Sequence, residues 1–447
     1  MKQQLLPRLS VFALFFLLSI AEISAQLPCK VLVGYWQNSW GTYIRLKDIN
    51  SNYNVICLSF LEADKNSNST DNVVSDLEFT PWSASDANIV NNLKTDIVTL
   101  QNQGKIVLMS IGGASGSFKL NSTNDKNTFV SKVKSAIQAY GVNGIDIDLE
   151  QPTYLDQTGT ISAPSAHISY VIQGIQELLT WYQTTYGKKM ILTMAPECVY
   201  TTGGLSTYQV GEGVPYLAII EALRNDIDLL MVQLYNAYES NGLNGVTYSD
   251  GTADFIVSQT EALIRGFTCK SGKGVYSGLP ASKIAVALPA TSASAGSGYV
   301  STAVAKSAVK YLMGTGTKPG SYTLVQSGGY PDLAGMMTWS INEDKDNGYA
   351  YALNYNSIFG TSSTNCTVSS AELQGEDTFE FYPNPAKSQV TFFNDGRQAV
   401  VNIYNAMGQA VLQQSLAQGS NVVDISMLST GLYIVNFGGE NKKMMVE

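Results

Sequence analysis

Short, almost continuously apolar runs alternate with longer amphipathic stretches through most of the chain. Runs of this kind are typical of strands that are buried on both faces of a parallel sheet. The runs are Lys30–Tyr35, Val55–Leu61, Lys105–Ile111, Gly144–Leu149, Met190–Ala195, Asp228–Tyr235, Ile284–Leu288 and Gly335–Ser340. Helical patterns separate them, for example Asn127–Tyr140, Ala166–Tyr186, Tyr216–Arg224 and Ile256–Arg265. This succession of eight units predicts an α/β fold, a (β/α)8 TIM barrel.

The structural alternative is an open, doubly wound sheet. Such a sheet usually has fewer strands, and no GxGxxG pattern follows the first apolar run. We therefore expect the barrel, with its catalytic residues at the carboxyl ends of the strands.

The composition of the chain changes after Phe359. A Ser/Thr-rich stretch follows, which is typical of a linker. Beyond Phe379 come short strand-like runs with turn residues between them: Val390–Phe393, Val400–Tyr404, Val411–Gln414, Asn421–Ile425 and Leu432–Phe437. This pattern predicts a small all-β sandwich. We place the catalytic barrel at residues 26–360, the linker at 361–376 and the sandwich at 377–447.

The N-terminal segment has the features of a secretion signal. Lys2 and Arg8 precede the apolar run Leu9–Ile20, and Ile23–Ala25 supplies the small residues of a cleavage site. The apolar run is too short to span a bilayer comfortably. We therefore expect residues 1–25 to be a signal peptide and the protein to be secreted.

Composition narrows the chemistry that the protein can perform. The 447 residues carry 36 acidic and 27 basic side chains, a formal net charge of −9, which disfavours nucleic acids and anionic membranes as partners. Hydrophobic residues amount to 45%, which excludes a disordered chain. His167 is the only histidine, and we expect it to lie at the surface or to cap a helix. Acid–base chemistry must therefore come from carboxylates and tyrosines.

The five cysteines show no CxxC spacing, which argues against a zinc site. Cys57 lies in an apolar run and is expected to be a buried thiol. An odd number of cysteines leaves at least one unpaired. A Cys29–Cys366 or a Cys198–Cys269 bridge is compatible with the sequence, which does not decide between them.

The segment 143–150 alternates strictly between apolar and acidic residues. One face of such a strand holds Ile145, Ile147 and Leu149, and the other holds Asp146, Asp148 and Glu150. Neighbouring acids would lie about 6–7 Å apart, and burying them together keeps at least one of them protonated near neutral pH. Proteins tolerate this mainly where a proton must be delivered. An exposed edge strand with solvated acids is the alternative, but the opposite face is aliphatic.

The acidic strand resembles the D-G-x-D-x-D-x-E signature of glycoside hydrolase family 18, the chitinase family, with Asn143 in place of the first Asp. That position lies outside the three acids of the inner face. Four further segments at strand ends are similar to motifs of the same family: Ser110–Gly113, Met194–Glu197, Gln233–Asn236 and Met337–Ser340. The resemblance covers the whole barrel. It implies hydrolysis of β-1,4 bonds between N-acetylglucosamine units of chitin, with retention of configuration through an oxazolinium intermediate.

The resemblance also implies roles for individual residues. Glu150 would be the general acid, and later the base that activates water. The acetamido oxygen of the substrate would act as the nucleophile, because this family is an exception among retaining glycosidases. Asp148 would hold the acetamido N–H, and Tyr235 would donate to the acetamido carbonyl oxygen. Asp146 would share a proton or a hydrogen bond with Asp148, and Ser110 would bond to this lower part of the network.

The residues expected at the substrate site are Trp339, Gln233, Asn236, Met194, Tyr35 and Ser110. Trp339 would form an apolar floor under the reacting sugar, because an aromatic face suits the C–H face of a pyranose. The alternative for Gln233 and Asn236 is a structural hydrogen-bonding role, and for Met194 and Tyr35 it is core packing. No metal and no organic cofactor is implied. The expected partners are chitin and its oligosaccharides, and we expect a monomer.

The C-terminal region resembles the sorting domain of the bacterial type IX secretion system. The similar segments are Tyr382–Pro385, Ile403–Asn405, Gly408–Gln409, Gly431–Val435 and Lys442–Lys443. The resemblance implies recognition by that secretion machinery and export across the outer membrane, with the tail removed or attached to the cell surface. A small carbohydrate-binding sandwich is the alternative, but its strands have few aromatics for gripping crystalline chitin.

The segment between Leu288 and Gly335 is too short for the extra domain that walls the groove of exo-acting family members. We therefore expect an open groove and endo-cleavage, with the Ser/Ala/Gly-rich loop Thr291–Ser301 as a mobile rim. The alternatives are an endo-β-N-acetylglucosaminidase acting on N-glycans and a catalytically inactive chitin-binding lectin. The presence of Glu150 argues against the lectin. The preferred chain length and the tolerance of deacetylated units do not follow from the sequence.

Overall fold

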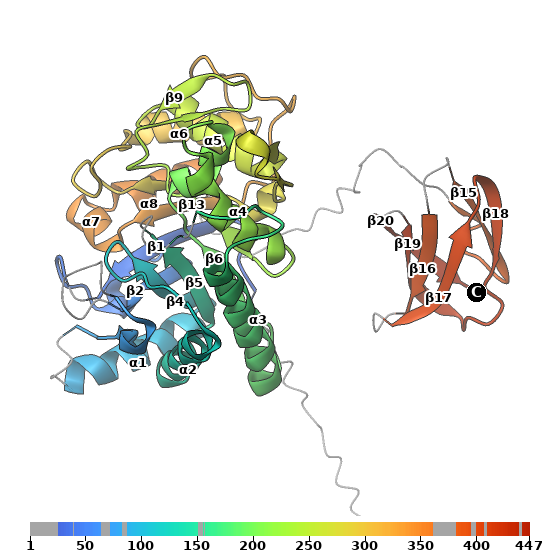
Figure 1. The fold of residues 1–447 in the computed structure, drawn as a ribbon, viewed down its shortest axis with the longest axis horizontal. Helices are drawn as coiled ribbons and strands as arrows, with labels where there is room; N and C mark the ends of the chain where they lie inside the picture. The colour runs from blue at the N-terminus through green and yellow to red at the C-terminus, as the bar shows by residue number, and fades with distance from the viewer. Residues whose placement is uncertain are drawn as a thin grey trace, which may run out of the picture. The chain divides into compact units, whose positions relative to one another are not determined.

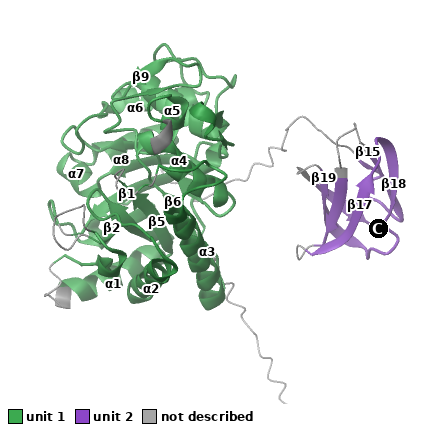
Figure 2. Ribbon diagram, in the orientation of Figure 1, with its two compact units in different colours: residues 1–365 green, residues 366–447 purple. Residues whose placement is uncertain are grey.

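The structure is a computed structural model that describes residues 26–38, 40–63, 72–82, 87–150, 155, 157–360, 381–394, 399–405, 409–437 and 440–447. The chain divides into two compact units, Met1–Asn365 and Cys366–Glu447 (Figure 2). The predicted signal peptide, 1–25, and the predicted linker, 361–376, lie outside the described residues.

Eight parallel strands in the described part of the first unit form a nearly closed barrel (Figure 1). Their bounds are β1 Val31–Gln37, β2 Val55–Glu62, β4 Ile106–Gly113, β5 Gly144–Leu149, β6 Ile191–Met194, β7 Leu229–Leu230, β12 Ala285–Pro289 and β13 Gly335–Trp339. They are hydrogen-bonded in the order β12-β13-β1-β2-β4-β5-β6-β7. Single bridges, Leu230 to Ile284 and Gln233 to Ala287, join the two ends of this order. The predicted barrel is therefore confirmed.

The seventh strand of the barrel is shorter than its apolar run predicts. The run Asp228–Tyr235 indicates a full strand, but the regular ladder ends at Leu230. Beyond it the chain makes isolated bridges, such as Gln233 to Glu197. Pro196, just after β6, has no N–H to donate, so the segment that follows β6 cannot continue the ladder with β7 there. This irregular end brings Gln233 toward the acids of β5.

Helices surround the barrel (Figure 1). Their bounds are α1 Ala87–Asn102, α2 Thr123–Tyr140, α3 Ala166–Tyr186, α4 Val210–Ala222, α5 Ala253–Arg265, α6 Thr302–Leu312, α7 Ile341–Asp346 and α8 Ala350–Phe359. Ser122 and Ser165 accept a backbone N–H at the start of α2 and α3, and Gly141 and Gly187 end these helices in the left-handed conformation. None of the helices in the described residues is long and apolar enough to cross a membrane.

Shorter elements lie in the connections between the barrel strands. The 3-10 helices are η1 Leu46–Asp48, η2 Val74–Asp76, η3 Cys198–Tyr200, η4 Thr202–Leu205, η5 Lys270–Gly272 and η6 Ala281–Lys283. The short strands are β3 Glu78–Phe79, which pairs with β2, and the antiparallel pairs β8 Glu239–Asn241 with β9 Thr247–Ser249 and β10 Phe267–Thr268 with β11 Val275–Tyr276.

The barrel strands separate two hydrophobic layers. On β5, the apolar residues Ile145, Ile147 and Leu149 pack in the outer layer, between strands and helices. The acidic residues that alternate with them point the other way, because successive side chains of a strand face opposite sides. Tyr35 of β1 belongs to the inner layer. The sequence alternation therefore places the acids inside the barrel.

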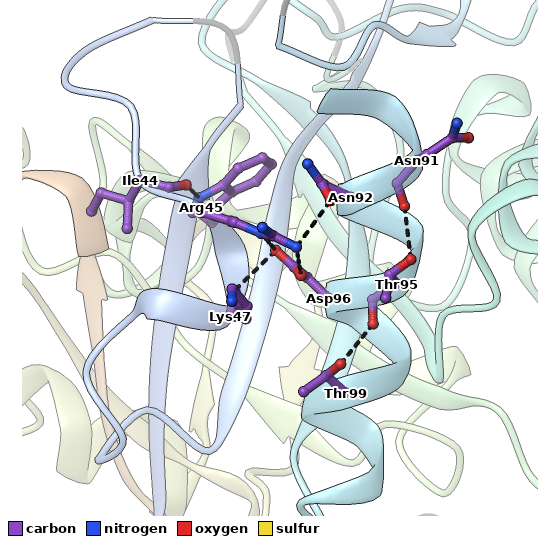
Figure 3. A network of polar contacts seen from close by, with 9 residues as sticks. Ile44, Arg45, Lys47, Asn91, Asn92, Thr95, Asp96 and Thr99 are labelled. Carbon is purple, nitrogen blue, oxygen red and sulfur yellow. Dashed lines mark hydrogen bonds and ion pairs between the residues drawn. The ribbon is translucent and has the colours of Figure 1, made fainter. Parts of the chain in front are cut away.

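A polar network fixes the chain after β1 against α1 (Figure 3). The Arg45 guanidinium donates to the two oxygens of Asp96 at 2.8 and 3.0 Å. Trp36, at the end of β1, donates its indole N–H to the carbonyl oxygen of Ile44 at 2.9 Å. Both ends of the short connection that carries Trp40 are thereby held.

The cysteines differ in their state. Cys57 is a buried free thiol, as predicted. Cys198 and Cys269 are also free thiols, so a bridge between them is wrong. Cys29 is disulfide-bonded, and Cys366, which the sequence allows as its partner, lies outside the described residues.

His167 is a core residue, contrary to the expected surface position. It is 4% exposed, and its Nδ1 accepts the backbone N–H of Leu120 at 2.9 Å. The ring packs inward from the first turn of α3, because the apolar face of that helix begins there.

The described residues of the second unit form two antiparallel sheets around one core. The sheets have the orders β14-β15-β18 and β17-β16-β19-β20. The bounds are β14 Phe381–Tyr382, β15 Gln389–Asn394, β16 Ala399–Tyr404, β17 Ala410–Leu416, β18 Gly419–Asp424, β19 Gly431–Phe437 and β20 Glu440–Val446. Both sheets contribute to the core, where the rings of Phe392 and Phe437 lie 6.4 Å apart. The predicted all-β architecture is confirmed, with β14 and β20 as strands that the apolar pattern does not predict.

Candidate active site

A cavity of about 490 Å³ opens where the barrel strands end. Its walls come from residues at or just after the carboxyl ends of β1, β2, β4, β5 and β13. The predicted residues that line it are Tyr35, Asp148, Glu150, Gln233, Tyr235, Asn236 and Trp339. The structure therefore brings most of the predicted site residues together in one place.

Asp146 lies beneath this cavity and is 0% exposed. Its Oδ2 accepts hydrogen bonds from the Tyr35 hydroxyl and the Ser110 hydroxyl, both at 2.7 Å. Its Oδ1 accepts from the Thr193 hydroxyl at 2.6 Å. Burial raises the pKa of Asp146, and these three hydrogen bonds lower it. Fixed neutral donors from β1, β4 and β6 thus hold this carboxyl in place.

Gln233 connects the two carboxyls that line the cavity. Its Nε2 lies 3.0 Å from Asp148 Oδ1, 2.9 Å from Glu150 Oε1 and 3.0 Å from the carbonyl oxygen of Ala195. The residue is 5% exposed, so these contacts are shielded from water. A buried donor shared by two acids stabilises their charged forms and holds them side by side.

Burial and mutual repulsion raise the pKa values of both acids. Burial and the negative charge of Glu197 raise the pKa of Glu150 to about 7, while hydrogen bonds from Gln233 and Asp148 act in the opposite direction. The pKa of Asp148 is raised well above its usual value, first by burial and then by the charges of Glu150, Asp146 and Glu197. A carboxyl that keeps its proton to nearly neutral pH can act as a general acid.

The Tyr235 ring lines the same cavity, and the residue is 6% exposed. Its hydroxyl has no hydrogen-bond partner among the described residues. Burial, followed by the charges of Asp148 and Glu150, raises the pKa of Tyr235 well above its usual value. The hydroxyl therefore stays protonated and is available to donate to a bound ligand.

Aromatic rings form one side of the cavity. The ring of Phe60 is stacked on Trp339 with 5.7 Å between centres, and Trp40 is stacked on Phe60 at 6.2 Å. We call Trp40, Phe60 and Trp339 the aromatic wall. Trp40 is 37% exposed, so the wall reaches from the cavity to the surface. Flat aromatic faces of this kind suit the C–H faces of sugar rings.

Two loops, after β7 and after β12, meet at the rim of the cavity. Asn236 Oδ1 accepts the backbone N–H of Gly296 at 2.8 Å. Asp250 Oδ2 accepts the hydroxyl of Ser297 at 2.5 Å. The loop Thr291–Ser301, which the sequence indicates as a mobile rim, is thus tied to its neighbour by hydrogen bonds. Asn236 has a loop-bridging contact in addition to its place in the cavity lining.

Ser110 and Met194 are not among the residues that line the cavity, and their contact with substrate stays a prediction. Both residues are 0% exposed. The Ser110 hydroxyl is bonded to Asp146, so it supports the acids from below. Met194 packs in the outer layer, because the alternation that points Thr193 inward points Met194 toward the helices.

Sequence reasoning missed several residues of this region. Trp40, Phe60 and Glu62 line the cavity, and Thr193 bonds to Asp146. Phe60 and Glu62 lie in or next to a predicted strand end, so a search for side chains at the ends of β1 and β2 finds this side of the cavity. Thr193 becomes recognisable only when β6 is aligned with β5, which pairs it with Asp146.

Comparison with known protein families matches two regions of the chain. Residues 31–361 match Glycosyl hydrolases family 18. Residues 380–447 match the Secretion system C-terminal sorting domain. The first match covers the barrel and its cavity, and the second covers the two-sheet unit.

The chain spans only part of the length of the first curated relatives that it matches. Chitinase Chi52 of Paenibacillus xylanexedens is 40% identical over 321 residues, which are 70% of this chain and 58% of that protein. Chitinase ChiA of Flavobacterium johnsoniae is 32% identical over 438 residues, which are 91% of this chain and 27% of that protein. A crystal structure of a family GH18 chitinase from Chromobacterium violaceum is similar with a TM-score of 0.64 and 30% identity, covering 74% of this chain and 84% of that one.

Proposed function

The chain belongs to glycosyl hydrolases family 18, and from this premise we propose that it is a chitinase that hydrolyses β-1,4 bonds between N-acetylglucosamine units. Similar proteins that are named chitinases support this substrate. The observation that carries the proposal is the position of Glu150, whose pKa is raised to about 7 beside Asp148 in a cavity with an aromatic wall.

In the first step, Glu150 donates its proton to the glycosidic oxygen as the bond to the leaving sugar breaks. The acetamido oxygen of the substrate attacks the anomeric carbon and forms an oxazolinium ion. Asp148 passes its own proton to Asp146 and then, as a carboxylate, accepts the acetamido N–H. The unpartnered hydroxyl of Tyr235 donates to the acetamido oxygen and orients it for attack.

In the second step, the Glu150 carboxylate takes a proton from a water molecule, which attacks the anomeric carbon and opens the ring of the intermediate. Two inversions at that carbon leave its configuration unchanged, so we propose a retaining reaction. Because Glu150 must start protonated and its pKa is about 7, activity falls as the pH rises above neutral.

We propose that cleavage occurs within the chitin chain. Between β12 and β13 the chain forms helix α6 and turns, with no additional strands among its described residues. The aromatic wall extends from Trp339 to the half-exposed Trp40, which suits a sugar chain that continues past the cavity. The match of the second unit to a secretion sorting domain implies export, and the predicted signal peptide supports the same route.

Glu150→Gln tests this function directly. The substitution keeps the shape of the side chain and removes its proton, so kcat should fall by about 10²–10⁴-fold, while binding of N-acetylglucosamine oligomers persists. The matched control is Glu177→Gln on the outer surface of α3, which should cut like the wild type. Mass spectrometry follows the products.

Three results would contradict the proposal. A Glu150→Gln variant that cuts as fast as the wild type excludes Glu150 as the acid. A wild-type protein that binds these oligomers but cuts only the chitobiose core of N-glycans is an endo-β-N-acetylglucosaminidase, and one that cuts neither substrate is a lectin.

A further inference from the structure

The two carboxylate oxygens of Asp146 are not equivalent. Oδ2 accepts two hydrogen bonds, from Tyr35 and Ser110, each at 2.7 Å. Oδ1 accepts one, from Thr193, at 2.6 Å. A carboxylate oxygen has about two acceptor sites. Counting the bonds from described residues, Oδ2 is therefore filled and Oδ1 keeps one free site.

Thr193 reaches Asp146 because β5 and β6 are paired with these two residues opposite each other. Opposite residues of a parallel pair point to the same face, so the Thr193 hydroxyl enters the barrel beside the carboxyl. Thr193 is 0% exposed and is not part of the cavity lining. It cannot touch a substrate, and any effect on the reaction passes through Asp146.

We propose that Thr193 is a positioning residue that keeps Asp146 Oδ1 ready to accept the proton of Asp148. This inference rests on the proposed function, in which Asp148 releases its proton before it accepts the acetamido N–H. In that transfer the O–H bond of Asp148 breaks and an O–H bond forms at Asp146 Oδ1, with no other reactant. The Thr193 hydrogen bond fixes the rotation of the acceptor and keeps it ionised beforehand.

The titratable groups that interact electrostatically with Asp146 come from four elements. They are Tyr35 on β1, Cys57 on β2, Asp148 on β5 and Tyr216 on α4. Burial raises the pKa of Tyr35, Cys57 and Tyr216 far above their usual values, so these groups stay neutral. Asp148, with Glu150 above it, is the group that exchanges a proton with Asp146.

Thr193→Val tests the inference because it keeps the branched shape and removes the donor. In the wild type, the hydrogen bond from Thr193 lowers the pKa of Asp146, and the variant loses this bond. Without it, Asp146 becomes protonated, and unable to accept, at a higher pH. The acid limb of the kcat profile should therefore move to higher pH, with kcat on that limb about tenfold lower and KM nearly unchanged. Thr193→Ser should restore the wild-type limb.

Thr338→Val on β13 is the matched control, because that buried hydroxyl donates to the carbonyl oxygen of Leu288 at 3.0 Å and not to an acid. It should leave the acid limb in place. If Thr193→Val does not fold, Thr193→Ala, which only removes atoms, takes its place. An unmoved acid limb, or a Ser variant that behaves like Val, overturns the inference.

Infrared titration of the full chain with ¹³C-labelled aspartate separates this inference from the proposed function. The band of protonated aspartate should persist to higher pH in Thr193→Val than in the wild type. If the wild type cuts no N-acetylglucosamine oligomer, the proposed function is wrong. The infrared band still decides whether Thr193 controls the protonation of Asp146. An identical band in both proteins contradicts that control.

Discussion

Glu150 shows at the scale of one residue how its surroundings set its chemistry. A carboxyl in water loses its proton near pH ~4.3. Burial and the charge of Glu197 raise the pKa of Glu150 to about 7, and the donors Gln233 and Asp148 limit the rise. Neutral donors, rather than a cation, offset the cost of burying the acids, and this leaves Glu150 with a proton to give.

Glu197→Gln should move the alkaline limb of the kcat/KM profile to lower pH. The substitution removes a negative charge that raises the pKa of Glu150, so Glu150 loses its proton at lower pH and can no longer act as an acid there. The profile is measured on soluble N-acetylglucosamine oligomers. Glu239→Gln on β8 is the matched control, since Glu239 is exposed. An alkaline limb that stays at the same pH, or moves to higher pH, excludes this coupling between Glu197 and Glu150.

The acids of β5 were predictable from the sequence, and their supports were not. Strict alternation over 143–150 places Asp146 and Asp148 on one face whatever the rest of the fold. Thr193 is found only through the register of β6 against β5. Met194 packs toward the helices, in agreement with its core-packing alternative, and the short motif alone could not decide between the two because it gives no register.

At the scale of elements, the loops after β7 and β12 hold Tyr235 between them. Gly298 lies so close that a Cβ atom at this position would be 2.4 Å from Tyr235 Cα, and its φ is +88°. Both the space and the backbone conformation require glycine there. The loop therefore acts as a support for the backbone that carries the Tyr235 hydroxyl.

Gly298→Ala should displace Tyr235 and lower kcat/KM by about 10- to 100-fold, because small misplacements of a positioning group are costly. Gly328→Ala is the matched control: its φ is +86°, but a Cβ there meets nothing within 4 Å. The control should lose about 1–2 kcal/mol of stability from strain alone and keep its kcat/KM. Steady-state kinetics and thermal unfolding separate the two effects. Equal kcat/KM values for the two variants contradict the supporting role of this loop.

The elements themselves were predictable where their pattern is long and regular. The strand Gly144–Leu149 and the helix Ala166–Tyr186 have the predicted bounds. The end of β7 was not predictable from its own apolar run, because Pro196, just after the neighbouring strand β6, stops the ladder. Strand β20 (Glu440–Val446) begins with polar and charged residues that hide its apolar alternation.

At the scale of the whole molecule, the two units match different protein families and have separate cores. The barrel holds the cavity and the acids, and its match to family 18 spans residues 31–361. The two-sheet unit has a core of its own and matches a secretion sorting domain. The order of strands made the barrel predictable, whereas the shape of its cavity depends on loops whose contacts arise only in the folded chain.

We propose that the substrate's acetamido group, and not a protein carboxylate or a directly attacking water, is the nucleophile. ¹H NMR of the reducing end released from an N-acetylglucosamine hexamer tests it most directly when spectra are taken before mutarotation. We predict that the β-anomer is released first, and that a fully deacetylated hexamer is not cut. Initial release of the α-anomer, or cleavage of the deacetylated hexamer at a similar rate, would contradict the account.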